Sequence, residues 1–193
     1  MPDDLAHPLP DAVHRVPSGA EDAPGLPALA GSVPFVHGLD TAPAYWWLDI
    51  LWVVLVKPED TGGRYSLMHE TLPKGSGAPP HKHVWSDEHF YILDGEVSFL
   101  VGEEIRTGRA GDFVFVPRNT RHAFRVESET AVFLNGYTPA GLEQAVIEHA
   151  TPAPTRTLPP PGATPPPAMT PALMRRYGMD DVPGPNPLPL GPH

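Results

Sequence analysis

Short apolar runs alternate with polar turns along the middle of the chain. Between residues 35 and 150, runs of about five to eight residues rich in Val, Ile, Phe, Tyr and Thr recur about every ten residues. Turn residues such as Asp94-Gly95 separate them. Regularly spaced short strands with turn signals between them are typical of a β-sandwich or β-barrel. The pattern therefore predicts an all-β domain over residues 35–150.

The most hydrophobic run covers residues 44–57 and contains three of the four tryptophans. Its Trp, Val, Ile and Leu content, between Pro43 and Pro58, favours one strand over a helix. Near-continuous apolarity implies that both faces are covered, one of them by a second subunit, so we expect a homodimer. Trp46 and Trp47 either line an aromatic ligand pocket or pack in the core, and we favour the core.

Two short helices are predicted towards the C-terminus. Thr138 followed by Pro139 has the pattern of an N-cap with proline in the first turn, and apolar residues follow at helical spacing. Thr170 and Pro171 repeat this pattern, and Gly178 supplies a stop, which predicts a helix over about 171–177.

Prolines divide the chain into three parts. Of 28 prolines, seven lie in residues 1–34, fourteen in 152–193 and seven between. We therefore predict a proline-rich N-terminal arm (1–34), a barrel domain (35–150) and a proline-rich C-terminal extension (151–193) that carries the last helix. A length of 193 residues fits one domain with extensions.

Composition excludes several kinds of partner and chemistry. The formal net charge of -10 argues against nucleic acid, whose binding needs clustered Lys and Arg. No stretch approaches the roughly 20 apolar residues of a transmembrane helix, so we expect no membrane partner. The acidic start of the chain does not resemble a signal peptide. The absence of cysteine excludes disulfides and thiolate ligands. We expect a cytoplasmic protein with a small-molecule partner.

Histidines and one glutamate gather between Gly75 and Gly95. His81 and His83 are two residues apart, so on a strand both point to one face. A tight turn would return Glu88 beside them, and His122 lies in a second stretch that begins at Gly111. Because such groups are costly to bury unpaired, a bound metal ion is the simplest explanation for their convergence.

Aromatic and aliphatic residues are expected to surround these ligands. If Glu88 faces inward, Phe90 and Ile92 share its face, whereas His89 points away and is a poor ligand. We predict a substrate pocket formed by Phe90, Ile92, Phe115 and Phe124. For any one of these four residues, ordinary core packing is the alternative.

The two glycine-to-histidine stretches resemble the paired motifs of the cupin superfamily. The first motif has every fixed position at the family's spacing, namely Gly75, His81, His83, Glu88 and Gly95. The second departs twice, with Asn119 where glycine is usual and Val126 where asparagine is usual. The resemblance implies a single cupin barrel, a jelly roll also described as a double-stranded β-helix.

More closely, several segments resemble quercetin 2,3-dioxygenase-like cupins of the actinobacterial type, among them those at 62–83 and 111–126. This resemblance implies a metal-dependent dioxygenase that cleaves a flavonol-type aromatic enol with O₂. It implies one divalent transition metal (nickel, cobalt, iron, manganese, copper or zinc) held by His81, His83, Glu88 and His122. Glu88 would also act as the general base that takes the enol proton.

Two other functions remain open on the same site. One is a different metal-dependent cupin enzyme, such as an isomerase, a lyase or another ring-cleaving dioxygenase. The other is a non-catalytic small-molecule-binding cupin, because one fold hosts many functions.

Overall fold

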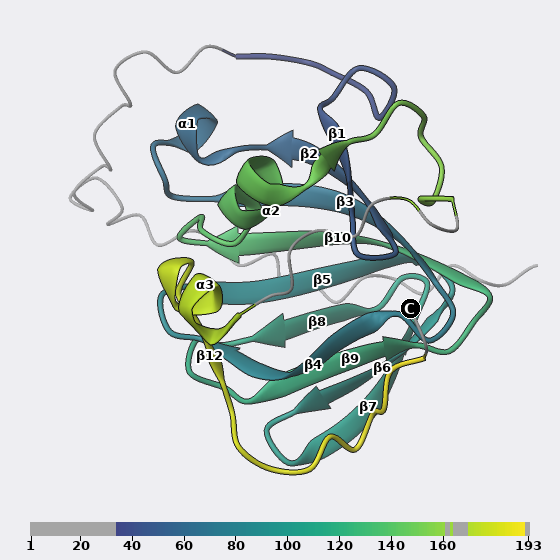
Figure 1. The fold of residues 1–193 in the computed structure, drawn as a ribbon, viewed down its shortest axis with the longest axis vertical. Helices are drawn as coiled ribbons and strands as arrows, with labels where there is room; N and C mark the ends of the chain where they lie inside the picture. The colour runs from purple at the N-terminus through teal and green to yellow at the C-terminus, as the bar shows by residue number, and fades with distance from the viewer. Residues whose placement is uncertain (1–33, 161–162, 164–169, 192–193) are drawn as a thin grey trace, which may run out of the picture. The chain divides into compact units, whose positions relative to one another are not determined.

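Two β-sheets form the framework of the computed structural model, which describes residues 34–160, 163 and 170–191. The first sheet has the order β11-β1-β2-β3-β10-β5-β8 and the second the order β12-β4-β9-β6-β7 (Figure 1). Neighbouring strands pair antiparallel throughout. The all-β prediction is therefore confirmed. The predicted N-terminal arm lies, except for Pro34, outside the described residues.

The strand bounds follow the chain order. The seven-stranded sheet comprises β1 (Ala44–Trp47), β2 (Ile50–Val56), β3 (Ser66–Pro73), β5 (Asp87–Asp94), β8 (Phe113–Val116), β10 (Thr130–Thr138) and β11 (Thr151–Pro152). The five-stranded sheet comprises β4 (Gly77–His83), β6 (Glu96–Val101), β7 (Glu104–Arg109), β9 (His122–Val126) and β12 (Met179–Asp181). Three short helices accompany them: α1 (Pro58–Thr61), α2 (Glu143–His149) and α3 (Pro171–Arg176).

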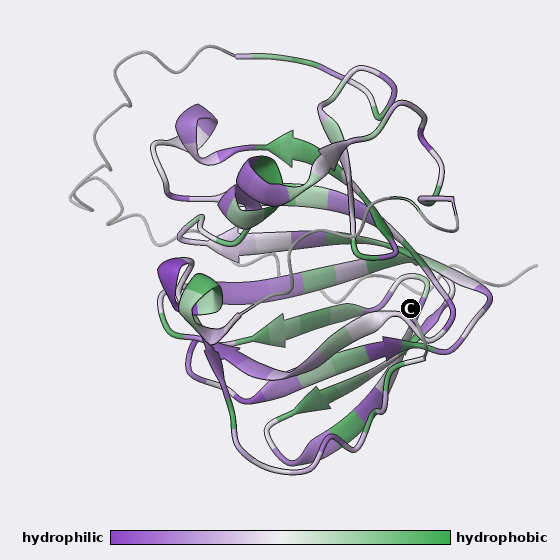
Figure 2. Cartoon of the chain, viewed as in Figure 1, coloured by the Kyte–Doolittle hydropathy of each residue, from purple (hydrophilic) through white to green (hydrophobic). Residues whose placement is uncertain are grey.

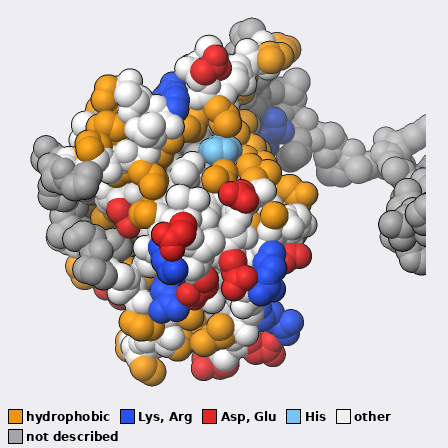
Figure 3. All heavy atoms as spheres, turned by 90° about the vertical axis from the view of Figure 1, so that its right-hand side faces the viewer, with side chains coloured by type: hydrophobic (Ala, Val, Ile, Leu, Met, Phe, Trp, Pro, Cys, Tyr) orange, Lys and Arg blue, Asp and Glu red, His pale blue; other side chains and the backbone are white. Residues whose placement is uncertain are grey.

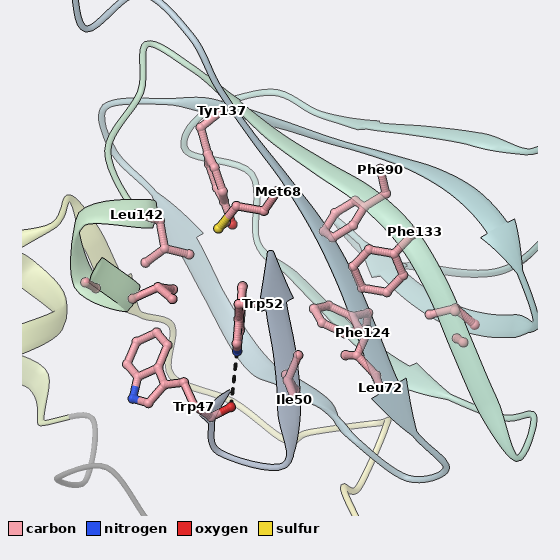
Figure 4. Close-up of a cluster of buried hydrophobic side chains, with 14 of the residues drawn as sticks. Trp47, Ile50, Trp52, Met68, Leu72, Phe90, Phe124, Phe133, Tyr137 and Leu142 are labelled. Atoms are coloured by element: carbon pink, nitrogen blue, oxygen red, sulfur yellow. Dashed lines mark hydrogen bonds between the residues drawn. The ribbon is translucent and has the colours of Figure 1, made fainter. Parts of the chain in front are cut away.

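Alternation along the strands builds the core between the two sheets. On β3 every second residue is buried, and on β5 the buried face carries Glu88, Phe90 and Ile92. Hydrophobic and hydrophilic residues alternate in colour along several strands (Figure 2). Figure 4 shows the aromatic centre of this core, where Phe90, Phe124 and Phe133 meet. Period-two burial of this kind determines which side chains face the interior.

The hydrophobic run at 44–57 is a β-hairpin, so the prediction of one strand was wrong. The chain turns between β1 and β2 at Leu48 and Asp49, and Leu48 has a φ of 58°. Trp47 lies opposite Ile50, and the Trp52 indole donates to the Trp47 carbonyl at 3.1 Å (Figure 4). Both arms of the hairpin are apolar, which hides the turn in the hydropathy pattern.

The chain itself covers most of this hairpin. Trp47 and Trp52 are buried, β11 pairs with β1, and α2 packs near β1. The Trp46 indole donates to the Thr157 carbonyl at 2.8 Å, which ties the hairpin to the C-terminal extension. A second subunit is therefore not needed to bury the run, and the homodimer stays a prediction.

One predicted helix is found and the other is displaced. Thr170 caps α3, because its hydroxyl accepts from the Leu173 amide at 3.2 Å, and Gly178 follows the helix with a φ of 72°. Thr138 is not an N-cap, because it pairs with Asp87 as the last residue of β10. The helix α2 begins five residues later, at Glu143.

The outer surface mixes charges of both signs. Figure 3 shows acidic and basic side chains side by side over the lower half of one face, with hydrophobic side chains more frequent above. Such mixing on this face offers no extended basic surface. Among the described residues, no helix has the length and apolarity needed to cross a membrane.

We expect Gly77→Ala to destabilise the fold more than Gly102→Ala. A Cβ at Gly77 would lie 2.0 Å from the Phe124 carbonyl oxygen, because β4 lies close against β9. Overpacking of this kind costs about 3 kcal/mol. Gly102 has a φ of 63° and open space around it, so its substitution costs only about 1 kcal/mol of backbone strain. Urea unfolding measures both losses, and equal losses would contradict the close approach.

Candidate metal centre

Both sheets contribute to a cluster of four polar side chains. The five-stranded sheet supplies His81 and His83 from β4 and His122 from β9, where His81 and His122 lie opposite each other. Glu88 comes from β5 of the seven-stranded sheet. All four side chains are buried. The sequence prediction that these residues converge agrees with this geometry.

The ligand atoms approach one another closely. His81 Nε2 lies 3.3 Å from His83 Nε2, and Glu88 Oε2 lies 3.3 Å from His83 Nε2. The same carboxylate oxygen lies 2.8 Å from His122 Nε2. One ligand atom from each of the four residues falls within 4.8 Å of all the others. The four donors thus surround a single point.

Backbone carbonyls orient two of the imidazoles. His81 Nδ1 donates to the Pro79 carbonyl at 2.8 Å, and His122 Nδ1 donates to the Thr120 carbonyl at 2.9 Å. A carbonyl only accepts, so the proton of each neutral ring sits on Nδ1 and the Nε2 lone pair faces the cluster. Outer hydrogen bonds of this kind orient metal-binding histidines.

Two residues of β10 hold Glu88. Tyr137 Oη donates to Glu88 Oε1 at 2.6 Å, and Asn135 Nδ2 donates to the same oxygen at 2.9 Å. Glu88 Oε2 faces the imidazoles and has no hydrogen-bond partner among the described residues. The sequence pattern did not predict a role for Tyr137 or Asn135. Asn135 is a polar residue on the buried face of an apolar strand, and a buried polar residue of this kind is expected to have a hydrogen-bond partner. This pattern could have identified it from the sequence.

Burial and mutual charge shift the protonation of the cluster. Burial, together with His122 and His83, lowers the pKa of His81 well below its ordinary value. Burial alone would raise the pKa of Glu88, but His83 and His122 bring it well below the usual range. Burial lowers the pKa of His122, but the Glu88 carboxylate close beside it raises that pKa overall. An ionised carboxylate beside a neutral imidazole suits a cation, which would compete with protons at His122.

The donor set fits one divalent metal ion. Metal–nitrogen and metal–oxygen bonds of about 2.1 Å at right angles place adjacent ligand atoms about 3 Å apart. The observed separations of 2.8 to 3.3 Å match this spacing. Buried Glu88 Oε2 and His122 Nε2 lack hydrogen-bond partners in the described structure, as atoms reserved for a metal would. Mixed nitrogen and oxygen ligands suit several transition metals and do not select one.

A largely apolar cavity of about 210 Å³ borders the cluster. His81, Glu88 and Tyr137 line it on the cluster side, and Trp47 and Leu48 line it from the β1–β2 hairpin. Its other lining residues are Ile50, Trp52, Glu70, Gly77, Ala78, Pro79, Phe90, Phe124, Asn135, Leu142, Met174, Met179 and Asp181.

The four predicted pocket residues divide between three places. Phe90 and Phe124 line the cavity. Ile92 is fully buried in the core and does not line it. Phe115 is 53% exposed, so its assignment to the pocket was wrong. Its strand pairs Val116 with Glu88, which directs Val116 inward and the preceding residue outward.

His89 and Glu70 lie on opposite sides of the seven-stranded sheet, His89 facing away from the core and Glu70 facing into it. His89 points away from the cluster, as expected, and stacks on Tyr65 and Phe113. Glu70 of β3 lines the cavity and was not predicted to do so from the sequence. Its position between Met68 and Leu72 on the buried face of β3 was the signal that could have found it.

Fold and site together define a double-sheet β-barrel with a buried cluster of three histidines and one glutamate. Residues 68–137 match the family model described as a cupin domain. The matched residues contain both motifs that the sequence pattern indicated as cupin-like.

Two curated proteins are similar in sequence. Quercetin 2,3-dioxygenase from Bacillus subtilis (strain 168) is 31% identical over 99 residues, which are 51% of this chain and 29% of that protein. An uncharacterized protein of Methanocaldococcus jannaschii is 34% identical over 61 residues, which are 32% of this chain and 49% of that protein. The matched region thus spans less than a third of the first relative and about half of the second.

Solved structures share the fold. KdgF from Halomonas sp. has a TM-score of 0.51 at 15% identity, covering 58% of this chain and 98% of its own. A predicted oxalate decarboxylase from Thermotoga maritima has a TM-score of 0.51 at 22% identity, covering 54% of this chain and 99% of its own. Both similarities show a shared fold.

Divalent metal should stabilise the wild-type protein and not the His81→Ala variant. At a hundredfold excess over its dissociation constant, a metal that binds only the folded state adds about 2.7 kcal/mol. For a chain of this size that raises the Tm by about 5–10 °C. Differential scanning calorimetry with and without nickel, cobalt or zinc measures the shift. His89→Ala, altered on the outward face, is the control and should retain it; a full shift in His81→Ala would contradict the site.

Proposed function

We propose that this protein is a metal-dependent dioxygenase that cleaves a flavonol-type aromatic enol with O₂. One observation carries the proposal: a carboxylate anchored through Oε1 presents its free Oε2 beside three imidazoles, at the border of an apolar cavity. This arrangement is open on the cavity side, whereas structural metal sites close their ligand shell. Similarity to quercetin 2,3-dioxygenase over half the chain supports the same reaction class.

Glu88 is the proposed general base. The metal, when bound, supplies a Lewis acid that stabilises the enolate and brings O₂ to the reaction. Glu88 Oε2 would bind the metal with one lone pair and take the proton of the enol hydroxyl on the other, while Tyr137 and Asn135 hold Oε1 and fix the direction of the carboxylate. A base must lie within hydrogen-bond reach of the proton it removes, and Glu88 lines the cavity in which the enol would bind.

The apolar walls of the cavity suit a flat aromatic substrate. Trp47, Trp52, Phe90 and Phe124 line it and offer ring surfaces on which a planar ligand stacks. Few polar groups interrupt these walls, so bound water is displaced and the charge interactions at the cluster strengthen. Pockets that combine apolar walls with a few converging polar groups are typical of small-molecule sites.

The size of the cavity favours a second candidate. At about 210 Å³ it is smaller than the roughly 300–1,000 Å³ typical of sites for drug-sized ligands. A three-ring flavonol would need more room than this, and Leu48, a lining residue that is 44% exposed, is a place where the cavity could extend. A smaller enol or diketone would fit inside, and it would be the substrate of another metal-dependent cupin enzyme, such as a lyase, an isomerase or a different ring-cleaving dioxygenase.

Turnover of quercetin in air distinguishes these functions. The purified protein is loaded with each candidate metal, and flavonol loss is followed by absorbance together with release of carbon monoxide. We expect flavonol loss and carbon monoxide in equal amounts. Flavonol binding without any product would instead indicate a binding protein. Absence of both, with turnover of a smaller enol, would indicate the second candidate.

Glu88→Gln should retain much of the bound metal and lose most of the activity. The amide keeps a ligand oxygen but cannot take a proton, and loss of a general base lowers kcat by about 10²- to 10⁴-fold.

Tyr137→Phe removes one of the two hydrogen bonds to Glu88 Oε1, and we expect it to lower kcat by about tenfold. Metal content and steady-state kinetics measure both effects. Full activity in Glu88→Gln would contradict its role as base.

A further inference from the structure

Glu70 is a buried acid to which the proposed reaction assigns no role. Its side chain is 1% exposed and lies on the inward face of β3. Trp52 of β2 and Phe133 of β10 are its neighbours across the sheet. Glu70 nevertheless lines the cavity that Glu88 also lines. A buried carboxyl group thus lines a largely apolar cavity.

The described residues provide no hydrogen bond for this group. Glu70 Oε1 is buried without a partner among the described residues. Glu88 and Glu143 also have one oxygen without a partner, but their other oxygen is bonded: that of Glu88 accepts from Tyr137 and Asn135, and that of Glu143 accepts from the Ser66 hydroxyl at 2.6 Å. Buried polar groups are nearly always hydrogen-bonded, and an exception requires an explanation. A ligand in the cavity would supply the missing partner.

Burial and the charge of Glu88 favour the protonated form of this acid. Burial, followed by the charge of Glu88, raises the pKa of Glu70 well above its ordinary value. A protonated carboxyl group has an O–H donor and an accepting oxygen, so it can bond either a carbonyl or a hydroxyl of a ligand.

Glu70 is set apart from the metal cluster by the sheet register. Glu88 lies opposite Tyr137, and Tyr137 lies opposite Ser66. Glu70 is therefore two strands across from Glu88 and two inward-facing positions beyond Ser66. Two strand spacings alone separate them by about 10 Å along the sheet. A ligand whose enol lies at Glu88 would reach Glu70 only with its far end.

We propose that Glu70 is a specificity-determining residue that hydrogen-bonds a hydroxyl or carbonyl oxygen at the end of the substrate remote from the metal centre. This inference rests on the proposed function for the identity of the enol. It adds that the substrate carries a second polar group, and that an enol without that group binds more weakly. Sites built around a buried polar group reject analogues that leave the group unpaired.

The first test needs no ligand. Glu70→Leu replaces an unpaired acid by an apolar side chain of similar size, so its Tm should equal or exceed that of the wild type. Glu143→Leu is the matched control, because it removes the partner of Ser66 and should lower the Tm. Metal content of both variants is measured alongside. A fall in Tm for Glu70→Leu as large as that for Glu143→Leu would show a structural role and overturn the proposal.

The second test compares two flavonols on the metal-loaded protein without oxygen. Quercetin carries hydroxyls remote from its enol, and 3-hydroxyflavone carries none. Quenching of tryptophan fluorescence gives both dissociation constants, since Trp47 and Trp52 line the cavity. The wild type should prefer quercetin by about tenfold, as one added hydrogen bond gives. Glu70→Leu should lose this preference, and Glu70→Gln, which keeps a donor and an acceptor, should retain most of it.

The outcomes separate this inference from the proposed function. An unchanged preference in Glu70→Leu, with flavonol bound, overturns the role of Glu70 and leaves the dioxygenase proposal intact. Failure of both flavonols to bind the wild type contradicts the flavonol substrate instead, and the stability comparison then decides for or against Glu70.

Discussion

The structure depends on bringing three imidazoles and one carboxylate together in the buried interior of the barrel. His81, His83 and His122 come from one sheet and Glu88 from the other, so the cluster joins both halves of the barrel. Without a cation, Glu88 Oε2 and His122 Nε2 remain without hydrogen bonds among the described residues. A divalent ion at their common centre would satisfy these atoms and link metal binding to the stability of the fold.

The seven-stranded sheet orients the Glu88 carboxylate and forms part of the cavity wall. Tyr137 and Asn135 of β10 bind one oxygen of Glu88 and leave the other free, so the strand beside the ligand strand fixes the direction of the carboxylate. Next in the sheet, β3 places Glu70 in the wall of the same cavity. The sheet thus arranges a base near the metal centre and a second acid away from it, and the apolar cavity between them is where a substrate would bind.

Local patterns in the sequence predicted the fold and the cluster but not its surroundings. The spacing of His81 and His83 and the position of Glu88 after a tight turn determine one face by strand alternation, which holds wherever strands are regular. Phe115 was misplaced because the register of β8 against β5 decides its face, and no local pattern reveals that register. The contribution of Tyr137 likewise depends on pairing between strands 49 residues apart. The hairpin at 44–57 was missed because apolar residues fill both of its arms.

X-ray absorption spectroscopy of the metal-loaded protein tests the central claim most directly. The structure predicts one ion per chain with three imidazole nitrogens and a carboxylate oxygen at about 2.0–2.2 Å. The imidazole signal should fall by one ligand in His122→Ala. An ion bound with fewer than three imidazoles, or a spectrum unchanged by that substitution, would contradict the account.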